Sequence, residues 1–209
     1  MAATLLTSTL MNAGNFGLPV ILFAFGEKAT AYGSLFFVTM MLFSYTVGII
    51  IASMGTASIG QAFINLLKVP TLYAMVLAFV FLRLQWQLPL PLDRSVKLLS
   101  DASIPSMILL LGMQFQAVEW TSKITPLAFV NVLRLMIGPA LAFGLNLVFG
   151  LSGPARQASI LESGMPIAVL TTILATEYDT EPSFVTAAVF TSTLLSAITL
   201  TLLISILGG

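Results

Sequence analysis

The chain has 209 residues, of which 58% are hydrophobic and 8% are charged, and its mean hydropathy is +1.04. A soluble domain carries about a quarter charged residues, so this composition predicts a polytopic membrane protein. Eight basic and eight acidic side chains give a formal net charge of zero, which leaves no basic surface for nucleic acid. Without cysteine or histidine the chain cannot form disulfides, thiolate or imidazole metal sites, or Cys/His and Ser/His catalytic pairs. We therefore predict no enzyme activity, no cofactor and no metal site.

Apolar stretches separated by charges or turn residues predict an all-α fold of about seven transmembrane helices, since roughly 20 apolar residues cross a ~30 Å hydrocarbon core. The predicted spans are 1–25, 30–54, 70–84, 95–118, 126–150, 154–176 and 182–207. Residues 55–69 carry apolar residues at helical spacing beside polar ones, which predicts an interfacial helix. Residues 87–93, QLPLPLD, alternate proline with leucine and predict an extended turn, and residues 177–182 predict an acidic turn.

A six-residue pattern occurs twice. Residues 15–20, NFGLPV, and 162–167, ESGMPI, both have a polar residue, any residue, Gly, Leu or Met, Pro, and Val or Ile. The copies lie five spans apart, so their orientations across the membrane are opposite. This predicts two inverted five-helix repeats, of which 1–54 is the end of the first, 55–69 a linker and 70–209 the complete second. The alternative is a chance match, because only Gly and Pro are identical.

Each copy of the pattern is expected to interrupt its helix. Proline lacks an amide hydrogen and its ring clashes with the carbonyl four residues earlier, so Pro19 and Pro166 each free the carbonyl of the polar residue that opens the copy. Gly17 and Gly164, two residues before the prolines, permit backbone angles that other residues resist. Non-helical backbone at membrane depth survives only where it is buried in protein or lines a wet cavity. Two such breaks predict one shared polar site.

The expected ligand of this site is an anion. We expect half-helices to start near Leu18 and Met165 and to direct their amide ends at the site, an arrangement that favours a carboxylate. Asn12 and Asn15 would add neutral donors. The alternative is a pair of proline kinks that only shapes helix packing.

Three ionisable residues within predicted spans are candidates for coupling or ion binding, because charges at membrane depth are costly and tend to mark pathways. Glu162 lies beside the second break, and burial favours the neutral, protonated form of a carboxyl group, so it could carry a coupling proton. Arg134 would need a partner such as Glu162 or Asp101. The alternative to a functional role for Arg134 is a static ion pair or a snorkelling side chain. Asp101 fits a helix start or the membrane interface equally well.

Several motifs in order resemble the auxin efflux carrier family of membrane permeases. They are NAGNFGLPV, KVPTLYAMVLAFVF leading to LPLP, LLSDASIPSMILLLGMQF, ESGMPIAV and VFTSTLLSAITL, and together they cover essentially the whole chain. The resemblance implies ten spans in two inverted five-helix repeats, with the fourth and ninth crossing at prolines beside the substrate. It implies that the first three spans are absent here. It also implies Pro19 and Pro166 as the crossing prolines, Asn12 and Asn15 as carboxylate contacts, and Glu162 at the equivalent position on the second crossing helix.

These patterns predict a secondary transporter, a permease or efflux carrier, for a small organic anion such as a carboxylate. It would work by alternating access at the crossed helices, with proton coupling through Glu162 as an addition. An uncoupled channel or facilitator, and a membrane sensor or structural subunit, are the alternatives. The expected surroundings are the lipid bilayer of the plasma or inner membrane, crossed several times, with a homodimer as a candidate assembly. Basic residues and the resemblance favour opposite orientations, so orientation stays open.

Overall fold

The structure is a computed structural model of the chain, and it describes residues 1–53, 60, 64, 67, 70–114 and 121–208. Within these residues every regular element is a helix, apart from one isolated β-bridge. The prediction of an all-helical fold is confirmed for this part of the chain. The interfacial helix predicted over 55–69 lies mainly outside the described residues.

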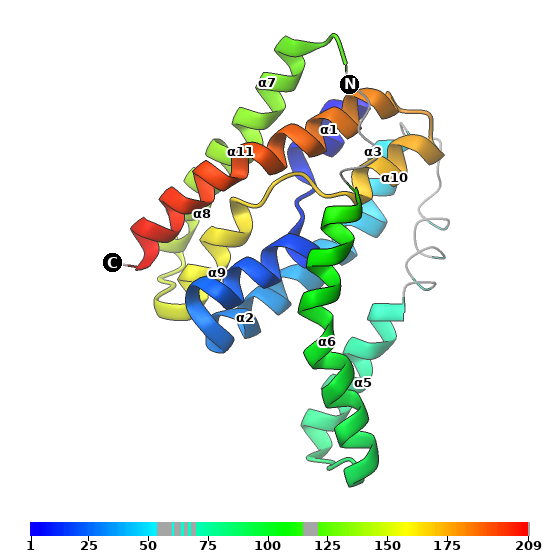
Figure 1. Cartoon of the computed structure of the whole chain (residues 1–209), viewed down its shortest axis with the longest axis vertical. Helices are drawn as coiled ribbons and strands as arrows, with labels where there is room; N and C mark the ends of the chain where they lie inside the picture. The colour runs from blue at the N-terminus through cyan, green and yellow to red at the C-terminus, as the bar shows by residue number, and fades with distance from the viewer. Residues whose placement is uncertain (54–59, 61–63, 65–66, 68–69, 115–120, 209) are drawn as a thin grey trace.

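The helices follow one another along the chain in three groups (Figure 1). The first group is α1 (Ala2–Thr9), the π-helical turn η1 (Ala13–Gly17), α2 (Leu18–Phe43), the π-helical turn η2 (Ser44–Gly48) and α3 (Ile49–Ala52). The second is α5 (Pro70–Leu84) with α6 (Leu90–Gln114), a pair that extends away from the other helices in Figure 1. The third is α7 (Ile124–Val132), the π-helical turn η4 (Leu133–Ile137), α8 (Gly138–Val148), α9 (Gly153–Ser163), α10 (Leu170–Glu177) and α11 (Pro182–Gly208).

Three helical stretches in the described part of the chain are long and apolar enough to cross a membrane: Ala13–Ala52, Ile124–Val148 and Pro182–Gly208. The first is not one straight rod, because Gly26 adopts a φ of 75° inside it. Only glycine takes this conformation readily. The interruption lies between the first two predicted spans, so the sequence located this boundary correctly. The long apolar helices support an integral membrane protein.

Helix α6 begins earlier than the sequence predicted. The extended turn was expected over 87–93, but the helix starts at Leu90 and only 86–89 lie without regular secondary structure. Pro91 therefore lies in the first helical turn, where an amide hydrogen would have no intrahelical partner and its loss costs nothing. The prediction failed because it treated both prolines as helix breakers.

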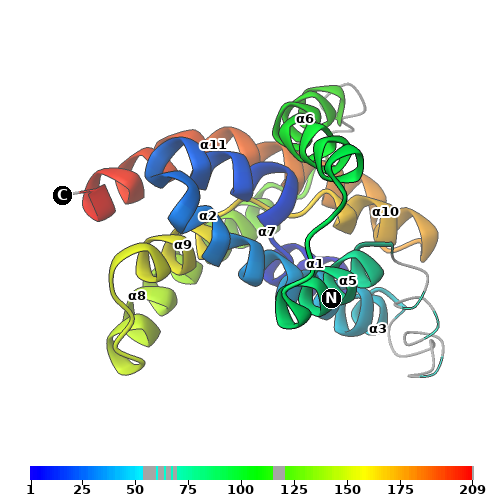
Figure 2. The same cartoon turned by 90° about the horizontal axis from the view of Figure 1, so that it is seen from below.

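Two helical stretches are interrupted where they meet. Helix α1 ends at Thr9 and helical structure resumes at Ala13, while α9 ends at Ser163 and α10 starts at Leu170. The intervening segments run antiparallel and pair through a bridge between Met11 and Ile167. In Figure 2, seen from below, α2 lies next to α9, in agreement with their extensive packing. We call the paired segments 10–12 and 164–169 the crossing.

The first interruption was predicted in the wrong place. Pro19 lies in the first turn of α2, and the helix continues back from it through η1 to Ala13. Within η1 the amide of Gly17 donates to the carbonyl of Asn12, five residues earlier, at 2.9 Å. This wider π-helical turn lies directly before Pro19, where the missing amide hydrogen of proline interrupts the usual pattern of helix bonds. The second half-helix was also misplaced, since it starts at Leu170 and not near Met165.

The crossing lies within the packed core. Ile167 packs among buried residues of α7 and α11, such as Val130 and Val185, and Leu10 packs on its other side with Leu6 and Ile49. Burial on both sides keeps the extended segments away from lipid, as non-helical backbone at membrane depth requires.

Candidate functional site at the helix crossing

The extended segments of the crossing satisfy their amides through specific partners. The bonds run from Asn12 N to Pro166 O at 2.8 Å, from Ala168 N to Leu10 O at 3.0 Å, and from Ile167 N to Ser192 Oγ at 3.1 Å. Ser192 belongs to α11 and is fully buried. An unpaired amide in this environment would cost several kcal/mol, of the order estimated for hydrocarbon. The crossing is therefore a specifically built structure, and a simple kink in each helix does not describe it.

Arg134 supplies the partners of the carbonyl groups next to the crossing. Its side chain is 4% exposed. Its Nε donates to Met165 O at 3.1 Å, Nη1 donates to Ser8 O at 3.5 Å, and Nη2 donates to Ser163 O. Nη2 also lies 3.9 Å from the sulfur of Met11. The cation thus binds backbone of both interrupted helices.

The ionic partners predicted for Arg134 are not its contacts in the structure. Asp101 pairs with Lys97 at 3.4 Å on α6, and the side chain of this aspartate is 61% exposed. Among the described residues Arg134 forms no salt bridge within 4.0 Å, with Glu162 or with any other acid. The hydrogen-bond partners of Arg134 are instead carbonyl oxygens freed by the two helix ends, while Glu162 acts on it as a nearby charge beyond salt-bridge distance.

Glu162 is the most unusual side chain near the crossing. It is 0% exposed, and neither carboxyl oxygen has a hydrogen-bond partner among the described residues. A Cβ added to Gly17 would lie 2.5 Å from Oε2, and one added to Gly33 would lie 3.5 Å from Oε1. Gly17 therefore leaves the room that the carboxyl group occupies, whereas a Cβ at Gly33 would be too close to Ile21 Cδ1, at 2.7 Å, and in ordinary contact with Glu162. Gly17 was predicted to matter for its backbone freedom, and Gly33 was not predicted at all.

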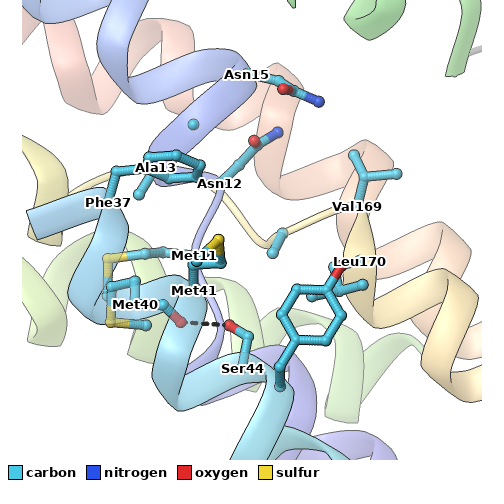
Figure 3. A pocket seen from close by; sticks show the side chains of 13 residues that line it. Met11, Asn12, Ala13, Asn15, Phe37, Met40, Met41, Ser44, Val169 and Leu170 are labelled. Atoms are coloured by element: carbon cyan, nitrogen blue, oxygen red, sulfur yellow. Dashed lines mark hydrogen bonds between the residues drawn. The ribbon is translucent and has the colours of Figure 1, made fainter. Parts of the chain in front are cut away.

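A cavity of about 240 Å³ opens beside the crossing, on the side of η1 and α2 (Figure 3). It is lined by Met11, Asn12, Ala13, Gly14 and Asn15, by Phe37, Met40, Met41, Ser44 and Tyr45, and by Ala168, Val169 and Leu170. None of these lining residues is charged. Figure 3 shows the amide groups of Asn12 and Asn15 pointing the same way. The side chain of Asn12 is 6% exposed, and its Nδ2 has no hydrogen-bond partner among the described residues.

Two helices begin at this cavity. Helical structure starts at Ala13 in the first stretch and at Leu170 in the second, and both residues line the cavity. The first amides of a helix have no acceptor within it, and the N-terminal end carries a partial positive charge. Together with the free amide of Asn12, these ends form a neutral site with positive potential. Such a site can bind an anion without a basic side chain.

The predicted site residues therefore separate into three places. Asn12 and Asn15 line the cavity. Gly17 packs against Glu162, and neither residue lines the cavity. Pro166 belongs to the backbone pairing of the crossing, whereas Gly164 allows close packing, since a Cβ there would lie 2.5 Å from Leu203 Cδ1.

Sequence analysis did not identify the cavity wall formed by α2 and η2. The polar residues of this wall are Ser44 and Tyr45, and its apolar residues include Phe37. Serine and threonine are common packing residues in membrane helices, and Ser44 donates to its own helix at Met40 O (2.7 Å), so the sequence carries no signal that distinguishes it. Only the fold brings this wall opposite the crossing.

Comparison with known proteins agrees with this architecture. The sequence profile of the family described as membrane transport protein matches residues 53–204. An uncharacterized transporter of Methanothermobacter thermautotrophicus is 26% identical over 93% of this chain and 64% of its own length. An uncharacterized transporter of Methanocaldococcus jannaschii is 27% identical over 97% of this chain and 67% of its own length. The chain thus spans about two thirds of the length of these two relatives.

The plant relatives include auxin efflux carrier component 8 of Arabidopsis thaliana, which is 30% identical over 57% of this chain and 33% of its own length. Auxin efflux carrier component 6 of the same plant is 27% identical over 57% of this chain. The predicted resemblance is therefore confirmed. The family profile covers most of the chain, and the protein accordingly belongs to the membrane transport protein family, with auxin efflux carriers among its relatives.

Proposed function

We propose that the cavity beside the crossing binds a small organic anion, a carboxylate, and that the chain is the substrate-binding part of a secondary transporter. The observation that carries this proposal is the meeting of two helix N-termini with the unpartnered amide of Asn12 in a cavity whose lining holds no charge. The substrate would supply the negative charge that the site lacks. Asn12 and Asn15 are the side chains proposed to bind it.

Movement by alternating access, with seven spans from two inverted repeats, is part of the same proposal. The meeting of the two interrupted stretches in one antiparallel bridge, between Met11 and Ile167, supports it. The sequence motif aligns Asn15 with Glu162, so the bridge and the motif differ in register. A multi-pass location in the plasma membrane and a homodimer remain predictions.

Proton coupling through Glu162 is the second element of the proposal. The carboxyl group is fully buried, has no hydrogen-bond partner among the described residues, and packs against η1, whose Ala13 to Asn15 line the cavity. An ionised carboxylate in such a position is costly, so a change in its charge would favour a change in the packing of η1. Asp101 has no part in this scheme, because it lies exposed on α6.

Substrate binding can be tested with purified protein and radiolabelled acetate, succinate and auxin. Asn12→Asp keeps the size of the side chain and adds a negative charge at the helix ends, so the affinity for carboxylates should fall by about tenfold or more. Ser44→Ala is the matched control, because the Ser44 hydroxyl lines the same cavity but already donates to Met40 O at 2.7 Å. Equal affinities of wild type and Asn12→Asp would refute the anion site.

Coupling can be tested by uptake into proteoliposomes with and without a pH gradient. We expect the gradient to stimulate uptake by the wild type and to have no effect on Glu162→Gln, whose side chain cannot release a proton. Uptake that never depends on the gradient would indicate a facilitator. Binding without any uptake would indicate a sensor or structural subunit.

A further inference from the structure

We propose that Arg134 is a positioning residue that holds the two interrupted helices in register by binding the carbonyl ends of both. This role differs from the coupling function that its position in a membrane span predicted. The inference adds to the proposed function, because the geometry of the anion cavity depends on the same crossing.

The contacts of Arg134 come from two segments far apart in the sequence. Ser8 belongs to the last turn of α1, whereas Ser163 ends α9 and Met165 follows it in the crossing. One guanidinium donates to the carbonyls of all three residues. The planar group has five N–H donors in a fixed fork, so it can bind several acceptors at once in a way that a lysine ammonium cannot reproduce.

The charge of Arg134 also complements these two helix ends. The C-terminal end of a helix carries a partial negative charge, and its last carbonyls have no intrahelical donor. Arg134 therefore neutralises the C-terminal ends of α1 and α9, while the N-terminal ends at Ala13 and Leu170 face the cavity without any charged residue in its lining. The cation and a bound anion would thus act on opposite ends of the interrupted helices.

Arg134 and the backbone it binds are packed tightly against α8. A Cβ added to Gly138 would lie 2.8 Å from Ser163 O and 3.0 Å from Arg134 Nη2. A methyl group at this position must displace either the carbonyl or the guanidinium. Gly138→Ala therefore disturbs the contact while it keeps the charge of Arg134. On the same helix, a Cβ added to Gly144 would have no neighbour within 4 Å in the described part of the chain, so Gly144→Ala is its matched control.

The register of the crossing can be measured by disulfide formation between Met11→Cys and Ile167→Cys. The two residues face each other in the bridge, and the hydrogen-bond pattern makes them a non-hydrogen-bonded pair with Cα atoms about 4.5 Å apart, within the range of a disulfide. The chain contains no cysteine, so no native thiol interferes. Crosslinking needs no substrate and is followed by mass after alkylation of free thiols.

We expect Arg134→Gln and Gly138→Ala to slow crosslinking about tenfold, as the loss of charge-assisted hydrogen bonds in a buried site predicts. Gly144→Ala should leave the rate unchanged. Arg156→Gln should also have no effect, because it removes a positive charge from α9 that lies 6.0 Å over the Phe143 ring, away from the crossing. If Arg134→Gln cannot be recovered as a folded protein, Gly138→Ala carries the test.

Two results separate this inference from the proposed function. Slower crosslinking in Arg134→Gln or Gly138→Ala would support the positioning role even if no carboxylate binds any variant, in which case only the anion site fails. Crosslinking at the wild-type rate in both variants, with a lower melting temperature as the sole effect, would overturn the positioning role. If both proposals hold, the affinity for the carboxylate should fall about tenfold in parallel with crosslinking.

Discussion

The two interrupted helices reach the same crossing by different local means. In the second, Pro166 lies within the extended segment, and its carbonyl accepts the amide of Asn12. In the first, the extended segment is Leu10 to Asn12 and contains no proline, while Pro19 lies in the helix that follows. Both segments nevertheless form the same bridge between Met11 and Ile167. A proline is therefore not required for the interruption, and the partners supplied by the rest of the fold maintain it.

Three sets of partners act at this place. The amides of Asn12 and Ala168 donate to carbonyls of the facing segment, and the amide of Ile167 donates to Ser192 Oγ. Arg134 donates to the carbonyls of Ser163 and Met165. The first interruption is stabilised only by these tertiary contacts, whereas the second also has a residue that cannot donate an amide hydrogen. Proline substitutions in the two segments, and substitutions of the residues that contact them, can test this difference.

The largest effect is expected from Ala168→Pro. The amide of Ala168 donates to Leu10 O at 3.0 Å, so proline removes one of the two bridge bonds and leaves a buried carbonyl unpaired. We expect the free energy of unfolding to fall by about 3 kcal/mol. Thermal and denaturant unfolding in detergent would measure it.

Met11→Pro is the matched substitution on the facing segment. The amide of Met11 donates no hydrogen bond within the described residues. Leu10 before it has φ −87° and ψ 122°, a conformation that a residue preceding proline adopts. The substitution removes the packing of the Met11 side chain but no backbone hydrogen bond, so the loss in the free energy of unfolding should be smaller than for Ala168→Pro. Equal destabilisation by both prolines would contradict the difference between the two segments.

A smaller loss is expected from Gly17→Ala. The new methyl group would lie 2.5 Å from Glu162 Oε2, and this carboxyl group is fully buried and cannot move into solvent. We expect a loss of about 2 kcal/mol, as for an overpacked core. The double substitution Gly17→Ala/Glu162→Ala should restore part of it when compared with Glu162→Ala alone.

Gly112→Ala is the control for this prediction. Among the described residues a Cβ added to Gly112 would have no neighbour within 4 Å, so alanine should stabilise α6 by up to about 1 kcal/mol through its helix propensity. A loss for Gly112→Ala as large as that for Gly17→Ala would show that the contact with Glu162 is not the cause.

The smallest effect is expected from Ser192→Ala. Ser192 Oγ accepts the amide of Ile167 at 3.1 Å, and alanine leaves that amide unpaired, at a cost of about 1 to 2 kcal/mol. Ser196→Ala is matched in type, helix and burial, but the Ser196 hydroxyl donates only to Thr193 O within its own helix, at 2.7 Å. It should change the unfolding free energy by less than about 0.5 kcal/mol. Similar losses for both serines would exclude a special role for Ser192.

Much of the fold followed from the sequence because hydropathy acts locally. The apolar stretches at 126–150 and 182–207 are continuous helices in the structure, and the boundary near Gly26 was expected. Boundaries failed where a proline was taken as a breaker, at Pro91 and at Pro19. Pro91 lies in a first helical turn, where it is tolerated, whereas Pro19 follows directly on the π-helical turn η1 and does not end the helical stretch that begins at Ala13.

The candidate site was predicted only in part. Asn12 and Asn15 were identified because polar amides inside an apolar span are conspicuous, and both line the cavity. The partners of Arg134 could not be predicted, because they are backbone carbonyls and any residue type could supply them. The packing role of Gly17 was missed for a similar reason, since it depends on Glu162, which lies far away in the sequence.

The sequence by itself determined that this is a helical membrane protein of the transporter family, because composition, span length and motif order are properties of the chain alone. The tertiary structure decided where the helices break and which groups meet there. Those features depend on hydrogen-bond partners and free space from distant segments, such as Arg134 with Ser8 and Glu162 with Gly17. Local propensity carries no information about such partners. At membrane depth an extended segment is stable only where its backbone amides and carbonyls have hydrogen-bond partners, because an unpaired group costs several kcal/mol.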